Sequence, residues 1–234
     1  MTNDLWLSLV ELDPRHRATR VALGDACARY RIVMAAFPGA PSRQHAGALY
    51  TFHPPAAEQP PRLLVQSTTK PDWSHRHDYR TRSAPQVQDI RPFWDEVIAG
   101  DRYLFRLTAS PCHGVGGHGG NRVRGTRTPI RDPTAQVSWL TRLLTDAAEL
   151  AHVHVTAPLK TIGRRGDRTV TLTSVTFSGD LTVTDPHRLR EQALTGIGPG
   201  KAFGNGLLTL ANAPTTHGAT RKDDRLACPN VPSC

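Results

Sequence analysis

A glycine-rich stretch near the C-terminal end constrains the fold of this chain more than any other segment. Residues Gly196–Gly206 hold five glycines in eleven positions, with Lys201 in the middle. Glycine adopts backbone conformations that other residues avoid, and it lets the backbone approach a ligand closely. The stretch follows a helical pattern and leads into the apolar strand pattern Leu207–Leu210. We therefore expect a helix–loop–strand connection that depends on glycine.

The two common phosphate-binding loops do not fit this stretch. A Walker loop has Ser or Thr after its lysine, whereas Ala202 follows Lys201 here. A dinucleotide-binding loop joins a strand to a helix, which is the reverse of the expected order. From the residues alone, the stretch is either a tight turn or a cradle of backbone N–H groups for an extended phosphate backbone. The residues of such a cradle would be Gly196, Gly198, Gly200, Lys201, Gly204 and Gly206.

The hydrophobic periodicity divides the chain into two similar halves, each with the order strand, helix, two strands, helix, strand. In the first half we expect strands at Leu5–Leu12, Ala48–His53, Arg62–Ser67 and Gln86–Ile90, a helix from Asp25 to Phe37, and a short helical or irregular piece at Asp72–Tyr79. In the second half we expect strands at Tyr103–Ser110, Val153–Ile162, Thr169–Val183 and Leu207–Leu210, and helices that begin after Asp132-Pro133 and Asp185-Pro186.

This order predicts an α+β protein with two tandem ferredoxin-like (RRM-like, βαββαβ) domains. We expect the first domain at residues 1–97 and the second, which carries the glycine-rich stretch, at residues 98–213. Residues 214–234 lack periodicity and are predicted to be a disordered tail. The fold by itself implies no function.

The composition favours a nucleic-acid partner. The formal net charge is +9 and the pI is near 10. This charge favours an anionic partner, with nucleic acid ahead of a membrane; the alternative is a basic surface that is only solvated. No signal peptide or membrane-spanning run is present, so we expect a cytoplasmic protein. The four cysteines form no Cys-x-x-Cys pair, and we expect no metal site and no cofactor.

Two segments concentrate the basic charge. Residues 111–131 hold Arg122, Arg124, Arg127 and Arg131 and no acidic residue, so this segment is either a basic loop that follows a phosphate backbone or a disordered connector. A second basic cluster is predicted at the turn between two strands. Its side chains would either contact an RNA duplex or simply be solvated. Its members are Lys160, Arg164, Arg165 and Arg168.

Short motifs follow one another in a fixed order over about residues 5–211. They are Leu5-Trp6-Leu7-Ser8, Leu64-Val65-Gln66-Ser67, Pro71-Asp72-Trp73, Arg91-Pro92-Phe93, Phe105-Arg106-Leu107-Thr108-Ala109-Ser110-Pro111, Gly179-Asp180-Leu181-Thr182-Val183 and the glycine-rich stretch. This ordered set resembles the CRISPR-associated precursor-RNA endoribonucleases, in particular the CasE type, a subunit of type I-E Cascade complexes.

The resemblance implies a metal-independent endoribonuclease that cleaves CRISPR repeat RNA. In that reaction the ribose 2′-OH attacks the adjacent phosphate and leaves a 2′,3′-cyclic phosphate and a 5′-OH. The implied partners are the repeat stem-loop, held largely by the C-terminal domain after cleavage, and the other Cascade subunits.

The chain departs from the family at the expected catalytic helix. CasE-type enzymes carry Tyr-x-x-His-Arg there, whereas this chain reads Cys27-Ala28-Arg29-Tyr30-Arg31. Tyr30 thus stands where the family has histidine, and a phenol is a reluctant base at neutral pH because its ordinary pKa is about 10. Cys27, Tyr30, Arg31 and the downstream His45 are the candidate catalytic residues. Tyr30 and Cys27 also fit a packing role on one helical face, so a binding subunit with weak or no activity is the alternative.

Overall fold

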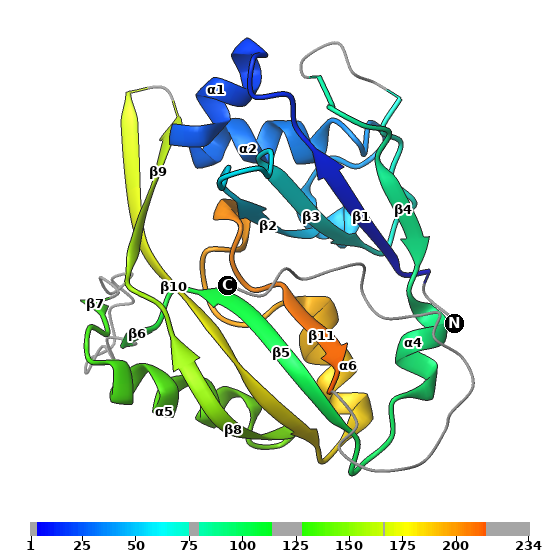
Figure 1. Cartoon of the computed structure of the whole chain (residues 1–234), viewed down its shortest axis with the longest axis vertical. Coiled ribbons are helices and arrows are strands. Elements are labelled where there is room, and N and C mark those ends of the chain that lie inside the picture. Colours follow the sequence, from blue (N-terminus) through cyan, green and yellow to red (C-terminus); the bar gives the residue numbers. More distant parts are fainter. Residues whose placement is uncertain (1–3, 75–79, 114–127, 166, 214–234) are drawn as a thin grey trace, which may run out of the picture.

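A computed structural model describes residues 4–74, 80–113, 128–165 and 167–213, except for the side chains of Arg165 and Arg168. The described residues fold into a four-stranded and a five-stranded antiparallel sheet with helices packed on them, which confirms the predicted α+β class (Figure 1). The predicted tail 214–234 and most of the predicted basic loop, residues 114–127, lie outside the described residues.

The N-terminal sheet has the strand order β2-β3-β1-β4, and each strand pairs antiparallel with its neighbours. Its strands are β1 (Trp6–Glu11), β2 (Leu49–His53), β3 (Arg62–Ser67) and β4 (Gln86–Asp89). Three helices connect β1 to β2: α1 (Arg17–Gly24), α2 (Ala26–Met34) and α3 (Arg43–Ala46). The strand positions agree with the sequence periodicity to within one or two residues.

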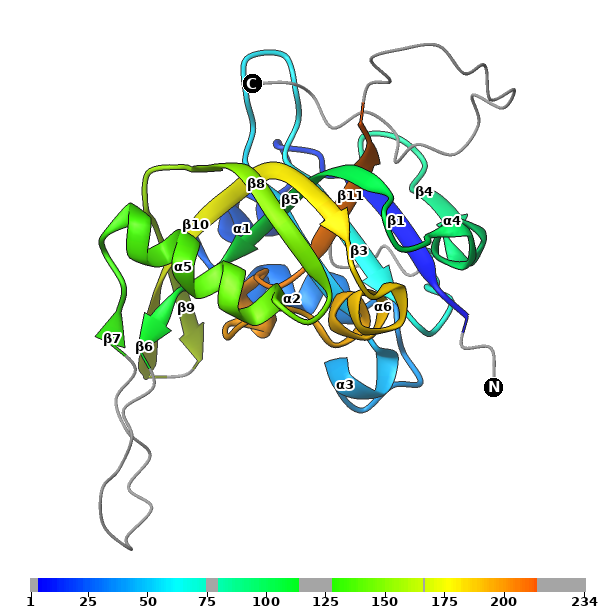
Figure 2. The same cartoon turned by 90° about the horizontal axis from the view of Figure 1, so that it is seen from below.

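The C-terminal sheet repeats this arrangement with the order β11-β5-β10-β8. Its strands are β5 (Arg102–Ala109), β8 (Ala148–Val155), β10 (Arg168–Val183) and β11 (Leu208–Asn212). The helices α5 (Pro133–Leu144) and α6 (Pro186–Thr195) pack on one side of the sheet (Figure 2). Both begin at the predicted Asp-Pro pairs, where the Asp132 and Asp185 carboxylates accept hydrogen bonds from Ala135 N and Arg188 N.

A long hairpin extends from this sheet along the N-terminal half. Strand β9 (Leu159–Arg165) pairs with the first half of β10, and the hairpin runs beside α1 and α2 (Figure 1). The prediction of one strand at Val153–Ile162 is therefore wrong, because the chain forms β8, a break at residues 156–158, and β9. Pro158 lies in the break and has no N–H with which to continue a ladder.

Three short helices are missing from the sequence prediction: α1, α3 and α4 (Arg91–Glu96). Only Thr19 and Ala22 of α1 are buried, and α3 and α4 span four and six residues. Such helices are too short to show a helical hydrophobic period. Of the predicted piece Asp72–Tyr79, residues 72–74 form a turn without helix and residues 75–79 lie outside the described part. The small elements β6 (Cys112–His113) and β7 (Thr128–Pro129) pair with each other.

Two clusters of buried apolar residues stabilise the protein, and the larger one draws on both halves. It joins the inward face of β5 and the helices α5 and α6 to Leu5, Leu7 and Trp94 of the N-terminal half. A buried hydrogen bond from Gln66 Nε2 to Ala193 O, 2.9 Å, also links β3 to α6. The two sheets therefore share a packed interface, and the predicted division at residue 97 stays a prediction.

Candidate functional site

Asp25 joins the first turn of α2 to the β9–β10 hairpin. Its Oδ1 accepts hydrogen bonds from Cys27 N at 2.9 Å and from Arg164 N at 3.0 Å, although the two donors are far apart in the sequence. The side chain of Arg164 itself is exposed. The carboxylate thus caps α2, as predicted, and also fixes the hairpin, which the sequence did not reveal.

The glycine-rich stretch meets the same end of α2. It contains a single turn of 3-10 helix, η1 (Lys201–Phe203). A Cβ atom placed on Gly163 of β9 would collide with the Phe203 ring and lie 3.1 Å from Cys27 Sγ. Cys27, Gly163 and Phe203 therefore pack against one another. Helix α2, the β9–β10 hairpin and the glycine-rich stretch, which were predicted separately, therefore meet at one place. Cys27 is half-buried in the contact between them.

Backbone hydrogen bonds hold the glycine-rich stretch in its shape. Ile197 N donates to Gly206 O at 2.9 Å, Gly206 N to Thr108 O at 2.8 Å, and Phe203 N to Gly200 O at 2.8 Å. These N–H groups are already used within the protein, so a phosphate cradle would have to be formed by other groups of the stretch. Five glycines have φ between +76° and +90°: Gly196, Gly198, Gly200, Gly204 and Gly206.

Gly200 and Gly206 are required by the protein's own packing. At Gly200 (φ +86°) a Cβ would collide with the Leu172 side chain and approach Asn205 Nδ2 to 2.8 Å. At Gly206 (φ +90°) it would lie 3.0 Å from Ile197 O. The packing of the protein thus explains why glycine stands at both positions, without any ligand. The predicted contact of these glycines with RNA stays a prediction.

A buried polar cluster fastens the end of the stretch to the C-terminal sheet. Asn205 Nδ2 donates to Ser110 Oγ at 2.9 Å and to Ser174 Oγ at 3.0 Å, and the two hydroxyls lie 3.1 Å apart. All three residues are buried. Because the partners satisfy one another, the cluster stabilises one position of the loop. Asn205 could not be predicted from the sequence, because no local pattern shows its distant partners.

Tyr50 holds the stretch from the opposite side. The residue is fully buried in β2, and its hydroxyl donates to Ala202 O at 2.8 Å. Burial raises the pKa of this phenol far above its ordinary value, more than Arg29 and Arg43 lower it. Tyr50 is therefore a neutral donor that ties η1 to the N-terminal sheet.

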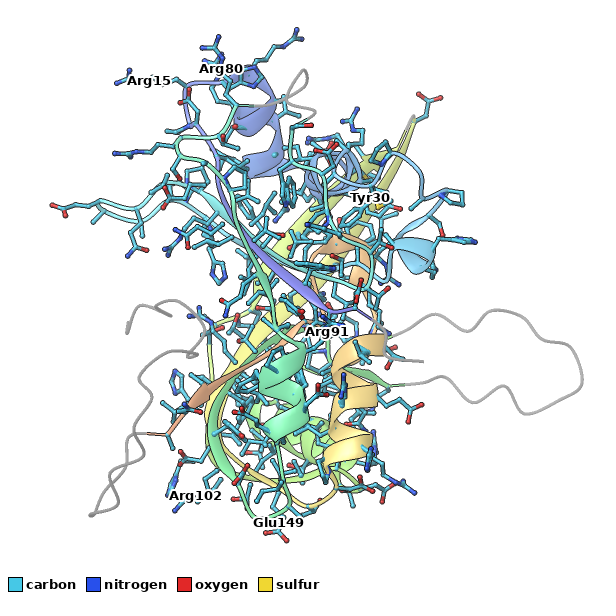
Figure 3. The ribbon with its side chains drawn as sticks, turned by 90° about the vertical axis from the view of Figure 1, so that its right-hand side faces the viewer. Arg15, Tyr30, Arg80, Arg91, Arg102 and Glu149 are labelled. Carbon is cyan, nitrogen blue, oxygen red and sulfur yellow. The ribbon has the colours of Figure 1, made fainter. Side chains whose placement is uncertain are left out.

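Tyr30 lies on α2, half-buried against the smaller core cluster. Figure 3 shows it in the N-terminal half near the β9–β10 hairpin, far from Arg102 and Glu149 at the opposite end. Arg43 of α3 is close enough to interact with it electrostatically. Burial lowers the pKa of the Arg43 guanidinium, and Tyr30 and Tyr50 act in the opposite direction. The guanidinium is fixed by a 2.8 Å hydrogen bond from Nη1 to Ala48 O.

The other catalytic candidates lie in different settings. Arg31, next to Tyr30, is exposed. His45 belongs to the short helix α3 and is exposed, with its Nδ1 2.7 Å from Ser42 Oγ. The Lys201 side chain runs back over the loop, since a Cβ on Gly196 would lie 2.8 Å from its Cε. No described contact joins His45 to Tyr30.

Helix α2 also carries a buried cation that was not among the predicted site residues. Arg29 is 7% exposed, and its guanidinium carbon lies 4.8 Å from the centre of the Phe52 ring. Burial lowers the pKa of this guanidinium, with Tyr50 and Asp25 opposing the shift. A polar residue within an apolar helical face would have been the only signal for it.

The basic cluster of the hairpin is only partly at the turn. Arg164 and Arg165 come near the end of β9, opposite Thr169 and Arg168. Lys160 pairs with Thr173 further down the strand, so its predicted place in the turn is wrong. Lys160 and Arg164 are exposed on one face of β9, because side chains alternate along a strand. The predicted RNA contacts Arg122, Arg124 and Arg127 lie outside the described residues.

Comparison with known proteins places this chain in a family. The family described as CRISPR associated protein matches residues 5–212. The chain belongs to this family. It is 29% identical to the CRISPR-associated endoribonuclease Cse3 of Thermus thermophilus over 88% of this chain and 100% of that protein. It is 26% identical to the Cascade subunit CasE of Escherichia coli K12 over 73% of this chain and 85% of that one.

The fold agrees with this assignment. The structure of Thermus thermophilus Cse3 bound to an RNA that represents a pre-cleavage complex matches with a TM-score of 0.77 and 29% identity. The match covers 89% of this chain and 99% of the solved one. The predicted resemblance to the CasE type is thus confirmed.

The structure carries two further observations about ligands and membranes. In the described ranges, no group of three His, Cys, Asp or Glu side chains is arranged to bind a metal ion. None of the helices in those ranges combines the length and the apolar character that a membrane span requires.

Proposed function

We propose that this protein is a metal-independent endoribonuclease that cleaves the stem-loop of CRISPR repeat RNA and stays bound to its product. The observation that carries the proposal is the meeting of α2, the β9–β10 hairpin and the glycine-rich stretch around Cys27, Gly163 and Phe203. The arrangement occurs in a chain that is similar to an RNA-bound endoribonuclease along almost its whole length. It puts an exposed basic hairpin face beside a helix with an ionisable side chain.

In the proposed reaction the ribose 2′-oxygen forms a bond to the adjacent phosphorus, and the bond from phosphorus to the 5′-oxygen breaks. The 2′-OH loses its proton to a base, and the leaving 5′-oxygen gains a proton from an acid. The pentavalent intermediate carries extra negative charge that nearby cations stabilise. The products are a 2′,3′-cyclic phosphate and a 5′-OH, and no water or metal ion is consumed.

Tyr30 is the proposed proton-transfer residue. It occupies the position where CasE-type enzymes carry histidine, and Arg43 lies within electrostatic reach of it. The Arg43 guanidinium would attract the phosphate and stabilise the negative charge of the intermediate. We assign Arg43 this role ahead of Arg31, which is exposed to solvent and more strongly screened. Cys27 is proposed to pack, and His45 is the next candidate if Tyr30 is inactive.

The RNA is proposed to lie on the C-terminal half and the hairpin. Lys160 and Arg164, with Arg165 and Arg168, would contact phosphates of the duplex, since RNA helices are recognised mostly by shape and backbone. The two halves, divided near residue 97, are proposed to be ferredoxin-like domains, which is supported by the repeated strand order. The proposed setting is the cytoplasm, with other Cascade subunits as partners.

One experiment tests this proposal directly. The purified protein is incubated with its repeat RNA in EDTA, and the products are separated on a denaturing gel. We expect a single cut that leaves a cyclic phosphate, and no cut in a DNA copy of the repeat, which lacks the 2′-OH. Binding without cleavage, in EDTA and in magnesium, would favour a binding subunit of the same architecture.

A further inference from the structure

A second basic surface lies at the far end of the N-terminal half. We define it by five exposed arginines, and we call it the terminal arginine surface: Arg15, Arg17, Arg20, Arg80 and Arg82. Figure 3 shows Arg15 and Arg80 close together at this end of the molecule, opposite Arg102. Neither the family motifs nor the proposed cleavage site includes these residues.

Backbone contacts bring the two parts of this surface together. Asp13 N donates to Arg80 O at 2.9 Å, and Arg82 N donates to Glu11 O at 2.9 Å. These bonds hold residues 80–82 against the end of β1, from which the chain passes directly into α1 with Arg17 and Arg20. Residues three apart on a helix share one face. The arginines are therefore arranged by the fold and not only by sequence.

The charge of this surface is only partly offset by nearby carboxylates. Within the described ranges, no ion pair engages these five guanidinium groups. Asp13 Oδ1 accepts from the backbone Arg15 N at 2.9 Å, and Glu11 Oε2 accepts from Ser83 Oγ at 3.0 Å. The five arginines outnumber Glu11, Asp13 and Glu58, so the surface keeps a net positive charge that attracts a polyanion.

The terminal arginine surface is also connected to the proposed cleavage site. Helix α1 ends at Gly24, next to Asp25, whose carboxylate binds Arg164 N of the β9–β10 hairpin. Figure 1 shows α1 beside this hairpin. The eight residues of α1 span only ~12 Å at 1.5 Å per residue. An RNA strand that extends from the β9–β10 hairpin would therefore need only a few nucleotides to reach Arg20, Arg17 and Arg15.

The surface includes an open cavity. Arg82 lines a hollow of about 420 Å³ together with Pro14, Glu58 and the surrounding residues of the β2–β3 loop. Sites for small ligands are commonly about 300–1,000 Å³, so the hollow has room for an unpaired base. Val21 and Leu23 are the exposed large apolar side chains of α1. Two such side chains provide too little apolar surface for the centre of a protein interface. The composition of this surface therefore favours RNA over an acidic protein as the partner.

We propose that the terminal arginine surface binds the phosphate backbone of the unpaired RNA that flanks the repeat stem-loop. Arginine suits this partner, because its planar guanidinium binds phosphate with two parallel hydrogen bonds and stacks on bases. The inference rests on the proposed function, since it takes the repeat stem-loop to be held at the hairpin. It extends the RNA-binding surface from the C-terminal half to the far end of the N-terminal half.

The test compares three RNAs with native and variant protein. The RNAs are the repeat stem-loop alone, the same stem-loop with about ten unpaired nucleotides on its 5′ side, and the same with about ten on its 3′ side. The variant carries Arg15→Gln, Arg17→Gln, Arg20→Gln, Arg80→Gln and Arg82→Gln. The control carries Arg102→Gln and Arg142→Gln, which remove exposed arginines far from the surface. Affinity is measured for each pair over a range of salt concentrations.

We expect the variant to bind one of the flanked RNAs at least about tenfold more weakly than native protein does, and the bare stem-loop equally well. For that RNA, the slope of the logarithm of the binding constant against the logarithm of the salt concentration should become less steep by about 0.7 for each lost phosphate contact. The responding RNA identifies the flank. Equal affinity of variant and native protein for every RNA would overturn the inference and leave the surface to an acidic protein. An equal loss on bare and flanked RNA would overturn it as well, because the residues would then contact the stem-loop itself or support the fold.

The same measurements separate this inference from the proposed function. If native protein fails to bind even the bare stem-loop, the proposed function fails and the inference fails with it. If native protein binds the bare stem-loop and gains nothing from either flank, only the inference is overturned.

Discussion

The carboxylate of Asp25 accepts a hydrogen bond from the backbone N–H of Arg164 at 3.0 Å, across 139 residues of sequence. The same oxygen accepts from Cys27 N and so begins helix α2. One side chain therefore sets both the start of the candidate catalytic helix and the position of the basic hairpin. This relationship makes Asp25 a better probe of the site's architecture than any of the exposed arginines.

Replacing Asp25 with alanine should destabilise the protein and weaken RNA binding. The variant loses a helix cap, worth about 1 kcal/mol, and leaves the Arg164 N–H without its partner, at a further cost of about 1 kcal/mol. Chemical denaturation measures the loss. Asp132→Ala is the control, because that residue caps α5 and is exposed. Equal losses for the two variants, with normal RNA binding by Asp25→Ala, would contradict the linking role.

Replacing Tyr30 with phenylalanine should slow cleavage and leave RNA binding intact. The change removes one hydroxyl and keeps the ring that packs against the smaller core cluster. The loss of one group that transfers a proton or donates a hydrogen bond lowers the rate about 10²–10⁴-fold. Single-turnover cleavage of repeat RNA measures it, and Tyr30→His should match or exceed the native rate. Full activity of Tyr30→Phe would remove Tyr30 from the mechanism and direct attention to His45.

Arg43→Gln should slow cleavage more than it weakens RNA binding. In the proposed reaction the Arg43 guanidinium stabilises the negative charge that develops on the phosphate, and the loss of one such group lowers the rate about 10²–10³-fold. The measurements are the single-turnover rate and the affinity for repeat RNA. Arg31→Gln is the matched control, since Arg31 is adjacent to Tyr30 in sequence but exposed. Equal rates for both variants and the native protein would exclude this role of Arg43.

Gly200→Ala should lower stability whether or not RNA is present. Its φ of +86° is unfavourable for any residue with a Cβ, at a cost of about 1–2 kcal/mol, and the new atom would press against Leu172 and Asn205. Gly24→Ala is the control, because no atom lies within 4 Å of its added Cβ and its φ is ordinary. Thermal unfolding compares the two. A stable Gly200→Ala variant that only binds RNA poorly would show that the glycine serves the ligand instead.

His53 should make the stability of the protein depend on pH. Burial, together with Arg106 and Arg62, lowers the pKa of this imidazole to about 4 from an ordinary value of 6.5. Between these values the unfolded chain binds a proton that the folded protein rejects, so stability is full above pH 6.5 and falls as the pH drops toward 4. The total effect is about 3 kcal/mol.

The variant His53→Gln tests this, because glutamine does not titrate. We expect its free energy of unfolding to change less between pH 7 and about 4 than that of the native protein. His187→Gln, at an exposed position, should keep the native dependence. If His53→Gln also keeps it, His53 is protonated in the folded state and the effect has another source.

The sequence by itself determined most of the strands, the capped helices and the family. Strands β1 and β3 appear in it as runs of apolar residues, and the helices α2, α5 and α6 begin at Asp25, Asp132 and Asp185 as predicted. Such signals are local, because a cap or a periodic stripe depends on residues within a few positions. The family resemblance was likewise carried by short motifs in order.

Only the tertiary structure decided how these elements meet. The Tyr50 hydroxyl reaches Ala202 O, Asn205 binds two serines from other strands, and Arg43 comes near Tyr30. Each contact joins residues from separate elements, and no periodicity in the chain marks the partners. The glycine-rich stretch illustrates the difference. Its composition predicted an unusual backbone, but the reason for each glycine is a neighbouring side chain or carbonyl that folding alone brings close.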